Sequence, residues 1–465
     1  MPADYDLVII GNSVAGIDAA LLAVRYKARV ALVEQNCQPQ FPRHHAIARI
    51  AQAIHGLTRF NQLHFFETPL EPAPVKFEAV NRWIDAIAQS QQEFYSPAKL
   101  GASGIEFIAD SGEFCRKPQT GFIVNNRLLR SRSYLIATDY FPTIPDIPGL
   151  KDINYLTPET ALTKPIRSLA IIGDDPIGVE LAQIYHRLGT QVTIILRHRH
   201  VLSIADSEAA FLVQASLEAE GIRIINARNI SEIRAVGQRK EIVVENYTID
   251  AEEILLAVGW QPGTSGLNLE AMSIREPILL NNRLQTAHPR VYWCGYSTSA
   301  IAQYQASIAV KNALFLSIFK ANYEYVAQSV VTHPEFAWIG LTQTEAIDRY
   351  NRDVVVLRQS FNSLFKAQIA GETTGLCKII VRRSGQILGA HVVALDASEL
   401  INTIALAMQQ GIKIQHLDRL PVSSPALSNV FNNAANEWWN WKLDQRSMVR
   451  DLTENYFSWQ RSRLR

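Results

Sequence analysis

One short pattern occurs twice in this chain and constrains its fold more than any other feature. The first copy starts with the apolar run Tyr5–Ile10, continues through the glycine turn Gly11–Gly16 and enters a predicted helix over Ile17–Tyr26. A second predicted strand, Arg29–Val33, ends at Glu34. A short apolar run of this kind is typical of a strand buried on both faces of a parallel sheet. Strand, turn, helix, strand and terminal acid together predict a βαβ unit that binds a dinucleotide.

Each residue of the first turn has an expected role. Gly11 and Gly16 permit a tight turn and close helix packing, and the N-terminus of the helix faces the pyrophosphate. Ser13 replaces the middle glycine of the pattern, but its side chain is small enough to keep the backbone near a phosphate. Glu34 can accept hydrogen bonds from a ribose. A purely structural turn is the alternative, and the complete βαβ context favours a nucleotide site.

The second copy has the same order of elements. It consists of a strand, a turn, a helix and a strand at Ser168–Ile172, Gly173–Gly178, Val179–Leu188 and Gln191–Leu196. Arg197 replaces the acid that ends the second strand, and a basic residue here accommodates the 2′-phosphate of NADP. Arg197 and His198 are therefore candidate phosphate ligands, with a solvated basic loop as the alternative.

Asp175 departs from the pattern at the second turn. It occupies the position of the second glycine, where the backbone should approach the pyrophosphate. Two unit charges about 4 Å apart at an effective dielectric of about 20 interact by roughly 4 kcal/mol. We therefore expect NADPH binding at this turn to be weak or lost.

Length and charge exclude several classes of protein. The chain has 465 residues, which predicts about three domains. Its 45 basic and 44 acidic side chains give a net charge of +1, which argues against nucleic-acid binding. The longest apolar runs fall far short of the roughly 18 residues of a membrane span, so no transmembrane segment is expected. The chain enters its first strand without a basic leader, and a cytoplasmic location is expected.

Cysteine spacing limits the redox chemistry. The chain has four cysteines, with no CxxC, CxxxxC or Cys/His cluster among them: Cys37, Cys115, Cys294 and Cys377. This spacing predicts neither a disulfide framework nor a metal site.

Several further segments carry a resemblance to a known family. They are the proline-rich crossing Tyr140–Gly149 and the segments Leu135–Asp139, Leu255–Pro262, His288–Gly295, Thr332–Leu341 and Gly385–His391. With the two turns they resemble the flavin-dependent pyridine nucleotide-disulfide oxidoreductases, such as glutathione reductase, dihydrolipoamide dehydrogenase and mercuric reductase. The resemblance implies an α/β fold in which two Rossmann-like domains, for FAD and NAD(P), precede a C-terminal α+β dimerisation domain. It also implies a homodimer.

The resemblance assigns domains and site residues. The expected domains are an FAD-binding domain in two segments (1–150 and 286–330), an NAD(P)-binding-like domain (151–285), a dimerisation domain (331–440) and a Trp/Arg-rich tail (441–465). The residues expected to bind FAD are Gly11, Ser13, Gly16, Glu34, Thr138 and Gly295. Those expected to bind NADPH are Gly173, Gly178, Glu180, Arg197 and His198, with Glu180 beside the nicotinamide.

The reactive centre of the family is missing from this sequence. Where the family has a CxxxxC pair, the chain has only Cys37, and His44 stands about where the family places a lysine close to the flavin. Ser424 and Asn429 replace the histidine and glutamate that the family contributes from the partner subunit. Further departures from the family pattern are Asp139, Trp260 and Tyr296. His44 and Cys37 are the catalytic candidates. The alternative for His44, as for its neighbour His45, is a partly exposed residue at the start of a helix. The alternative for Cys37 is a bystander thiol.

Two functions are compatible with these features. The first is an FAD-dependent NAD(P)H oxidoreductase without dithiol chemistry, which passes electrons to a small-molecule acceptor that is not a disulfide. The second is an inactive dimeric scaffold that binds a protein partner, for example through the segment Glu437–Lys442 and Trp459. These tryptophans could instead pack against the dimerisation domain.

Overall fold

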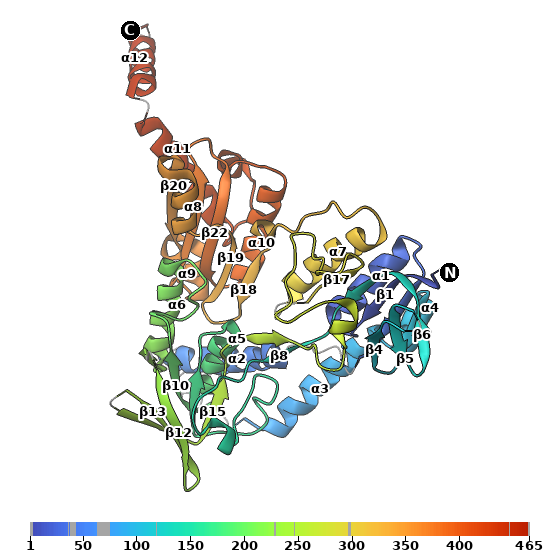
Figure 1. Cartoon of the computed structure of the whole chain (residues 1–465). Coiled ribbons are helices and arrows are strands. Elements are labelled where there is room, and N and C mark those ends of the chain that lie inside the picture. Colours follow the sequence, from blue (N-terminus) through green and yellow to red (C-terminus); the bar gives the residue numbers. More distant parts are fainter. Residues whose placement is uncertain are drawn as a thin grey trace. The chain divides into compact units, whose positions relative to one another are not determined.

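The computed structural model describes residues 3–35, 37, 43–62, 75–117, 119–226, 229–245, 247–295, 299–445 and 447–463. The chain forms two compact units (Figure 1). The first unit comprises Met1–Arg197 and Arg223–Tyr323, and the second comprises His198–Ile222 and Glu324–Arg465. The mixed α/β architecture predicted from the sequence is confirmed.

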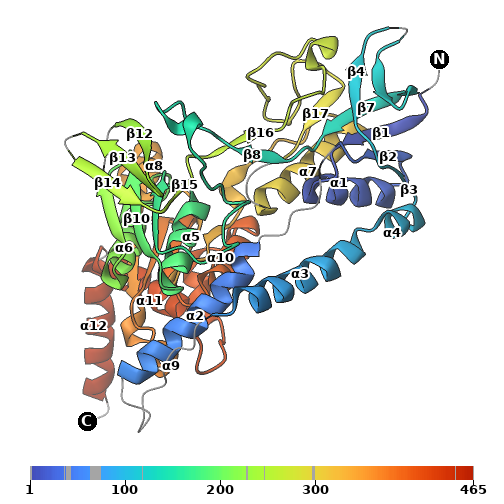
Figure 2. The same cartoon turned by 90° about the horizontal axis from the view of Figure 1, so that it is seen from below.

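A parallel five-stranded sheet forms the centre of the first nucleotide-type fold. In spatial order its strands are β17 (Val291–Trp293), β7 (Ser131–Ile136), β1 (Tyr5–Ile10), β2 (Val30–Val33) and β3 (Ile105–Ile108). Helices α1 (Val14–Arg25) and α7 (Ser299–Leu314) lie together on one face (Figure 2). The antiparallel strands β4 (Gly112–Cys115), β5 (Gly121–Val124) and β6 (Arg127–Leu129) cover the other face. Because both faces are covered, β2 is buried throughout and β1 is buried except at the half-buried Asp6, as predicted for strands inside a parallel sheet.

The second nucleotide-type fold repeats this arrangement with four parallel strands. They are β11 (Arg223–Asn226), β10 (Gln191–Leu196), β9 (Ser168–Ile172) and β15 (Glu253–Leu256). Helix α5 (Pro176–Arg187) follows β9. An antiparallel sheet of β12 (Ile230–Val236), β13 (Arg239–Val244) and β14 (Tyr247–Ala251) shares a hydrophobic core with these strands.

Two connections complete the first unit. Strands β8 (Tyr140–Pro142) and β16 (Trp260–Pro262) pair antiparallel to each other. Helices α2 (Arg43–Gln62), α3 (Phe77–Phe94) and α4 (Pro97–Ala102) carry the chain from β2 to β3, and α2 packs against α5.

The second unit contains an antiparallel five-stranded sheet. Its strands, in spatial order, are β18 (Gln328–Val330), β19 (Glu335–Gly340), β22 (Ile387–Ala394), β21 (Leu376–Arg382) and β20 (Val354–Ser360). Its helices are α6 (Ser207–Glu220), α8 (Gln343–Tyr350), α9 (Phe365–Ala370), α10 (Ala397–Gln409), α11 (Asn429–Asp444) and α12 (Ser447–Arg463). None of the helices described is both long and apolar enough to cross a membrane.

Most of the tryptophans near the C-terminus are structural. Trp438 on α11 is fully buried in the core of the second unit, and Trp439 and Trp441 pack against that core. The ammonium group of Lys442 lies over the Trp438 ring, 4.3 Å from its centroid. Packing against the dimerisation domain is therefore confirmed for these three rings, whereas Trp459 on α12 is 48% exposed.

A buried ion pair fixes α6 to the sheet of the second unit. Lys378 on β21 is 2% exposed, and its Nζ lies 2.9 and 3.0 Å from the two carboxylate oxygens of Asp206. A second carboxylate, from Glu208, approaches the same Nζ to 2.8 Å. Asp206 also caps the N-terminus of α6 by accepting a hydrogen bond from the Glu208 N–H. Burial raises the pKa of Asp206, but the hydrogen bond from Lys378, the charges of His391 and Lys378 and the hydrogen bond from the Gln343 N–H together outweigh it and leave that pKa below its usual value.

Replacing Asp206 should destabilise the second unit strongly. Asp206→Ala leaves the Lys378 ammonium buried beside only one carboxylate, and we expect a loss of about 3 kcal/mol in unfolding free energy near neutral pH. Because the folded pKa of Asp206 lies below the unfolded value of about 3.9, its contribution is present above that pH and declines as the pH falls below it. The difference between wild type and variant should therefore shrink in acid. Chemical denaturation at several pH values measures this.

Glu324→Ala provides the matched control in the same unit. It removes the ion pair with Arg349. Because the Glu324 and Arg349 side chains are 38% and 50% exposed, the change should cost about 1 kcal/mol or less in unfolding free energy. Equal losses in the two variants, or a difference that stays constant down to strongly acidic pH, would contradict the account of Asp206.

Candidate functional site

The first glycine turn packs against the end of the neighbouring strand β7. Gly11 has φ +112°, and a Cβ atom there would lie 2.4 Å from the carbonyl oxygen of Ala137. A Cβ atom on Gly16 would lie 2.1 Å from the carbonyl oxygen of Gly11. Since both obstacles are backbone atoms, only glycine fits at either position. The predicted packing role of the two glycines is confirmed.

Ser13 has a role that the sequence pattern did not reveal. Its hydroxyl caps α1 by accepting a hydrogen bond from the Gly16 N–H at 3.2 Å, and it donates to the Ala137 carbonyl at 2.6 Å. The hydroxyl therefore joins the start of α1 to the end of β7. An expected role toward a phosphate stays a prediction.

Two buried polar atoms beside this turn are unpaired. Neither Asn12 Oδ1 nor Thr138 Oγ1 has a hydrogen-bond partner among the residues described, although the two residues are only 6% and 4% exposed. Asn12 follows β1 and Thr138 follows β7, so both lie at the carboxyl edge of the sheet. Leaving a buried polar atom unpaired costs roughly 1–3 kcal/mol, and a ligand with polar groups would relieve that cost. Asn12 was missed in the sequence analysis, although a polar residue inside the glycine turn is a recognisable signal.

The other predicted FAD residues lie at the same edge. Glu34 directly follows β2 and is half-buried, and Gly295 lies two residues after β17, with its N–H donating to Gln305 Oε1 at 3.0 Å. In open α/β sheets, ligands bind outside the carboxyl ends of the strands. The residues present therefore fit an FAD molecule across this edge. Tyr296 lies outside the described residues.

The second turn has the same backbone packing but a different helix cap. A Cβ atom on Gly173 would lie 2.0 Å from the Ala257 carbonyl oxygen, and one on Gly178 would lie 2.4 Å from the Ala257 Cβ. Asp175 caps α5 by accepting a hydrogen bond from the Ile177 N–H at 3.1 Å.

Trp260 connects to this cap from β16. Its side chain donates a second hydrogen bond to the Asp175 carboxylate. Burial raises the pKa of Asp175, and the hydrogen bonds from Ile177 and Trp260 act against that rise. The N-terminus of α5 is thus already in contact with an acidic side chain of the protein.

His44 and Glu180 meet where α2 packs against α5. His44 Nε2 lies 3.0 Å from Glu180 Oε2, and His45 Nε2 lies 3.6 Å from the same oxygen. The Glu180 side chain is only 6% exposed. Burial raises the pKa of Glu180, but the two imidazoles outweigh it and lower the pKa to about 2. The structure therefore joins two predicted site residues that are far apart in the sequence.

The cysteines do not form a redox pair. All four are free. Burial raises the pKa of the Cys37 thiol to about 12, and the neighbouring Asp139 carboxylate adds to that rise. Cys37 follows β2 and Cys294 follows β17, strands that are separated by β1 and β7, or three spacings of about 4.8 Å. Cys115 lies on β4, and Cys377 lies on β21 in the second unit.

Other predicted residues lie apart from these contacts. Arg197 and His198 follow β10 and are exposed, and their role toward a 2′-phosphate stays a prediction. Ser424 is exposed, and Asn429 is half-buried at the start of α11.

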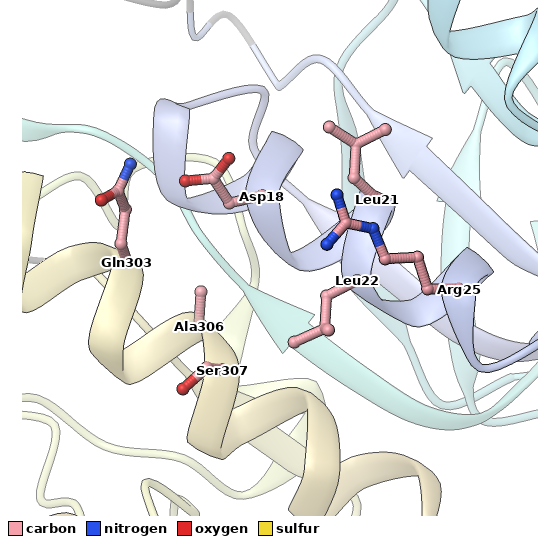
Figure 3. Close-up of a pocket in the computed structure, with 7 residues that line it drawn as sticks. All are labelled: Asp18, Leu21, Leu22, Arg25, Gln303, Ala306 and Ser307. Atoms are coloured by element: carbon pink, nitrogen blue, oxygen red, sulfur yellow. The ribbon is translucent and has the colours of Figure 1, made fainter.

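A hollow of about 210 Å³ lies between α1 and α7, away from both turns. Figure 3 shows the residues that line it: Asp18, Leu21, Leu22, Arg25, Gln303, Ala306 and Ser307. Burial raises the pKa of Asp18 there, although a hydrogen bond with Gln303 opposes the rise. None of the lining residues belongs to a glycine turn, so this hollow is distinct from the predicted FAD site.

Family models match both parts of the chain. The model described as pyridine nucleotide-disulphide oxidoreductase matches residues 5–310, and that of its dimerisation domain matches residues 326–435. The chain belongs to this family. Members of the family depend on FAD and use NAD(P)H, and the matched dimerisation domain fits a homodimer.

Individual relatives extend the comparison. The mercuric reductase of Staphylococcus aureus is 30% identical over 446 residues, which cover 89% of this chain and 79% of the relative. The dihydrolipoyl dehydrogenase of Chlamydia pneumoniae is 25% identical, with 94% of this chain and 97% of the relative covered. The solved structure of LpdA from Mycobacterium tuberculosis has a similar fold, with a TM-score of 0.81 at 24% identity, and covers 93% of this chain and 99% of that one.

Removing the unpaired hydroxyl of Thr138 tests the predicted FAD site. Because Thr138 Oγ1 has no partner, Thr138→Val should leave the stability of the FAD-free protein unchanged or slightly higher. It should weaken FAD binding about tenfold, the effect of losing one hydrogen bond of about 1.4 kcal/mol. Thermal unfolding of the FAD-free protein and fluorescence titration with FAD measure the two effects.

Thr190→Val is the matched control. Thr190 is also 4% exposed, but its hydroxyl donates to the Ile166 carbonyl at 2.7 Å. This variant should lose about 1 kcal/mol of stability without a change in FAD affinity. The assignment fails if Thr138→Val destabilises the FAD-free protein as much as Thr190→Val does.

Proposed function

We propose that this chain is an FAD-dependent NAD(P)H oxidoreductase whose electron acceptor is not a disulfide. The observation that carries the proposal is the state of Cys37, a lone buried thiol with a pKa raised to about 12. A thiol must ionise to attack a disulfide or to form a charge-transfer pair, and this one stays protonated at neutral pH. When bound, FAD would supply hydride acceptance and onward electron transfer.

The first turn would hold the cofactor. Gly11, Gly16 and Ser13 bring the N-terminus of α1 to the carboxyl edge of the sheet, where its partial positive charge favours a pyrophosphate. The unpaired oxygen atoms of Asn12 and Thr138 lie at the same edge and support the presence of a polar ligand there.

The His44–Glu180 pair would organise the reacting side of the site. In the family, a lysine close to the flavin stands about where His44 lies, and the resemblance places Glu180 beside the nicotinamide. The Glu180 carboxylate accepts from His44 Nε2 at 3.0 Å and fixes a proton on that nitrogen. This contact orients the His44 ring and keeps the start of α2 against α5.

The second turn limits the use of NADPH. Asp175 already contacts the N-terminus of α5, and a pyrophosphate in the same place would bring like charges together. We propose that NADPH binds weakly at this turn for that reason. Trp260 supports the arrangement because its hydrogen bond stabilises the carboxylate in the capping position.

Asp175→Gly should strengthen NADPH binding at least tenfold. The change removes the like charge, and loss of the cap to glycine costs only a few tenths of a kcal/mol. The measurement is the NADPH concentration needed to bleach half of the visible flavin absorption under anaerobic conditions. Asp174→Gly makes the same charge change one residue earlier, outside the cap, and should have a smaller effect. Equal gains in NADPH affinity from both variants would mean that only the net charge matters. No gain from Asp175→Gly would refute the proposed role of the Asp175 charge.

The second candidate function is a dimeric scaffold without redox activity. It is favoured by the Asp175–Trp260 contact, which occupies the place expected for the nicotinamide cofactor's phosphates. The visible spectrum of the purified protein separates the candidates. A yellow protein that bleaches with NADPH supports the oxidoreductase, whereas a colourless dimer that does not take up added FAD supports the scaffold.

Replacing Cys37 should leave electron transfer intact. Cys37→Ala should reduce a quinone or ferricyanide with NADPH at the wild-type kcat, because no step needs the thiol. Cys294→Ala, another buried thiol, controls for the loss of packing. A specific loss of kcat in Cys37→Ala would show that the sulfur takes part and would end the proposal of a thiol-independent path.

A further inference from the structure

Two histidines and one glutamate converge at the contact between α2 and α5. Nε2 of His44 and Nε2 of His45 lie 3.0 and 3.6 Å from the same oxygen of Glu180. The three potential ligand atoms all lie within 4.8 Å of one another. The two imidazole rings touch edge to face, with centroids 4.3 Å apart. No other group of three such side chains this close occurs in the part of the chain that the structure describes.

We propose that His44, His45 and Glu180 bind one divalent transition-metal ion of the zinc class. Two imidazole nitrogens and one carboxylate oxygen form a ligand set typical of zinc sites that keep an open position. With metal–ligand distances of about 2.1 Å, tetrahedral ligand atoms are about 3.4 Å apart. The distances from Glu180 Oε2 to Nε2 of His44 and of His45, 3.0 and 3.6 Å, lie close to this value and therefore suit such an ion.

Donor chemistry selects the class of ion. Imidazole nitrogen favours zinc, copper, nickel and cobalt, whereas magnesium and calcium prefer sites made of oxygen atoms. Two of the three donors here are nitrogen atoms, so the harder cations should bind poorly.

The site combines two buried ligands with one that is partly exposed to solvent. The Glu180 and His44 side chains are 6% and 13% exposed, so packing holds them in place. The His45 side chain is 45% exposed and leaves one side of the cluster open to solvent, through which an ion could enter and keep water as its remaining ligand. Arg43, the next cation along α2, lies 3.2 Å from Asp85, and this pairing partly balances its charge.

The metal site shares His44 and Glu180 with the proposed redox site, but it does not need FAD. Its ligands come from two helices of the first unit and not from the glycine turns, so it should bind metal with or without FAD. A bound ion would link α2 to α5 and would occupy the Glu180 carboxylate.

The experiment measures zinc binding directly. Full-length protein, stripped with EDTA and exchanged into chelator-free buffer, is titrated with Zn²⁺ in a calorimeter, and its FAD content is recorded from the visible spectrum. One ion per chain should bind, and Mg²⁺ should not compete. Co²⁺ in place of Zn²⁺ should give the visible absorption of a four- or five-coordinate site that includes nitrogen ligands.

Single substitutions locate the site. His44→Gln and His45→Gln should each weaken zinc binding at least tenfold, because each removes one of three ligands. His45 is the cleaner variant because its side chain is half exposed and its replacement should not disturb folding, which circular dichroism verifies. His333→Gln is the matched control. His333 Nε2 lies 3.2 Å from Glu372 Oε1 in the second unit, and neither residue belongs to a three-ligand cluster of described residues. This variant should bind zinc like wild type.

Three results would overturn the inference. They are the absence of saturable zinc binding, unchanged affinity in a folded His45→Gln variant, and an equal loss in His333→Gln. A colourless protein that still binds zinc through His45 would remove the proposed redox function and leave the metal site in place. A yellow protein that NADPH bleaches but that does not bind zinc would do the reverse.

Discussion

Close contact between each glycine turn and the end of a neighbouring strand is the constraint on which both nucleotide-type folds depend. Gly11 and Gly173 approach the carbonyl groups of Ala137 and Ala257 so closely that a Cβ atom would lie 2.4 and 2.0 Å from the oxygen atoms. These carbonyl groups lie at the ends of buried parallel strands and cannot move without disturbing the sheet. The contact brings the N-terminus of each following helix to the carboxyl edge of its sheet, where ligands bind in this class of fold. The position of each site therefore follows from backbone packing, whichever ligand it takes.

The two turns share this packing but differ in the electrostatics of the helix cap. A helix N-terminus carries about half a positive charge and attracts anions. Ser13 caps α1 with a neutral hydroxyl and leaves that charge available, whereas Asp175 brings an acidic group of the protein to α5. The hydrogen bond from Trp260 stabilises the same carboxylate. The two departures at Asp175 and Trp260 are thus parts of one arrangement, and the proposed weakness of NADPH binding at the second turn rests on it.

Sequence patterns predicted those parts of the fold whose determinants are local. The bounds of α6, Ser207–Glu220, are set by local signals, because Asp206 caps its start and Gly221, with φ +110°, ends it. The contact between His44 and Glu180 could not be predicted in this way, since it depends on how α2 packs against α5. The same holds for the unpaired atoms beside the first turn, because an unsatisfied oxygen becomes visible only when its surroundings are known. Local sequence signals thus predicted where the glycine turns lie, whereas tertiary packing determined which polar groups lie around them.

The side chains that the structure brings together differ in whether they can carry a proton, a metal ion or an electron pair. A thiol with a pKa near 12 is ionised in roughly one molecule in 100,000 at pH 7, so Cys37 provides almost no nucleophile. His44, His45 and Glu180 can hold a proton or a metal ion, but imidazole and carboxylate groups do not store an electron pair as a dithiol does. With no pair of cysteines to act as an intermediate carrier, a reduced cofactor in this protein would have to contact its acceptor directly. Under the proposed function, the acceptor would therefore fit beside the cofactor itself, and its shape and redox potential, more than its sulfur chemistry, would decide which molecules are reduced.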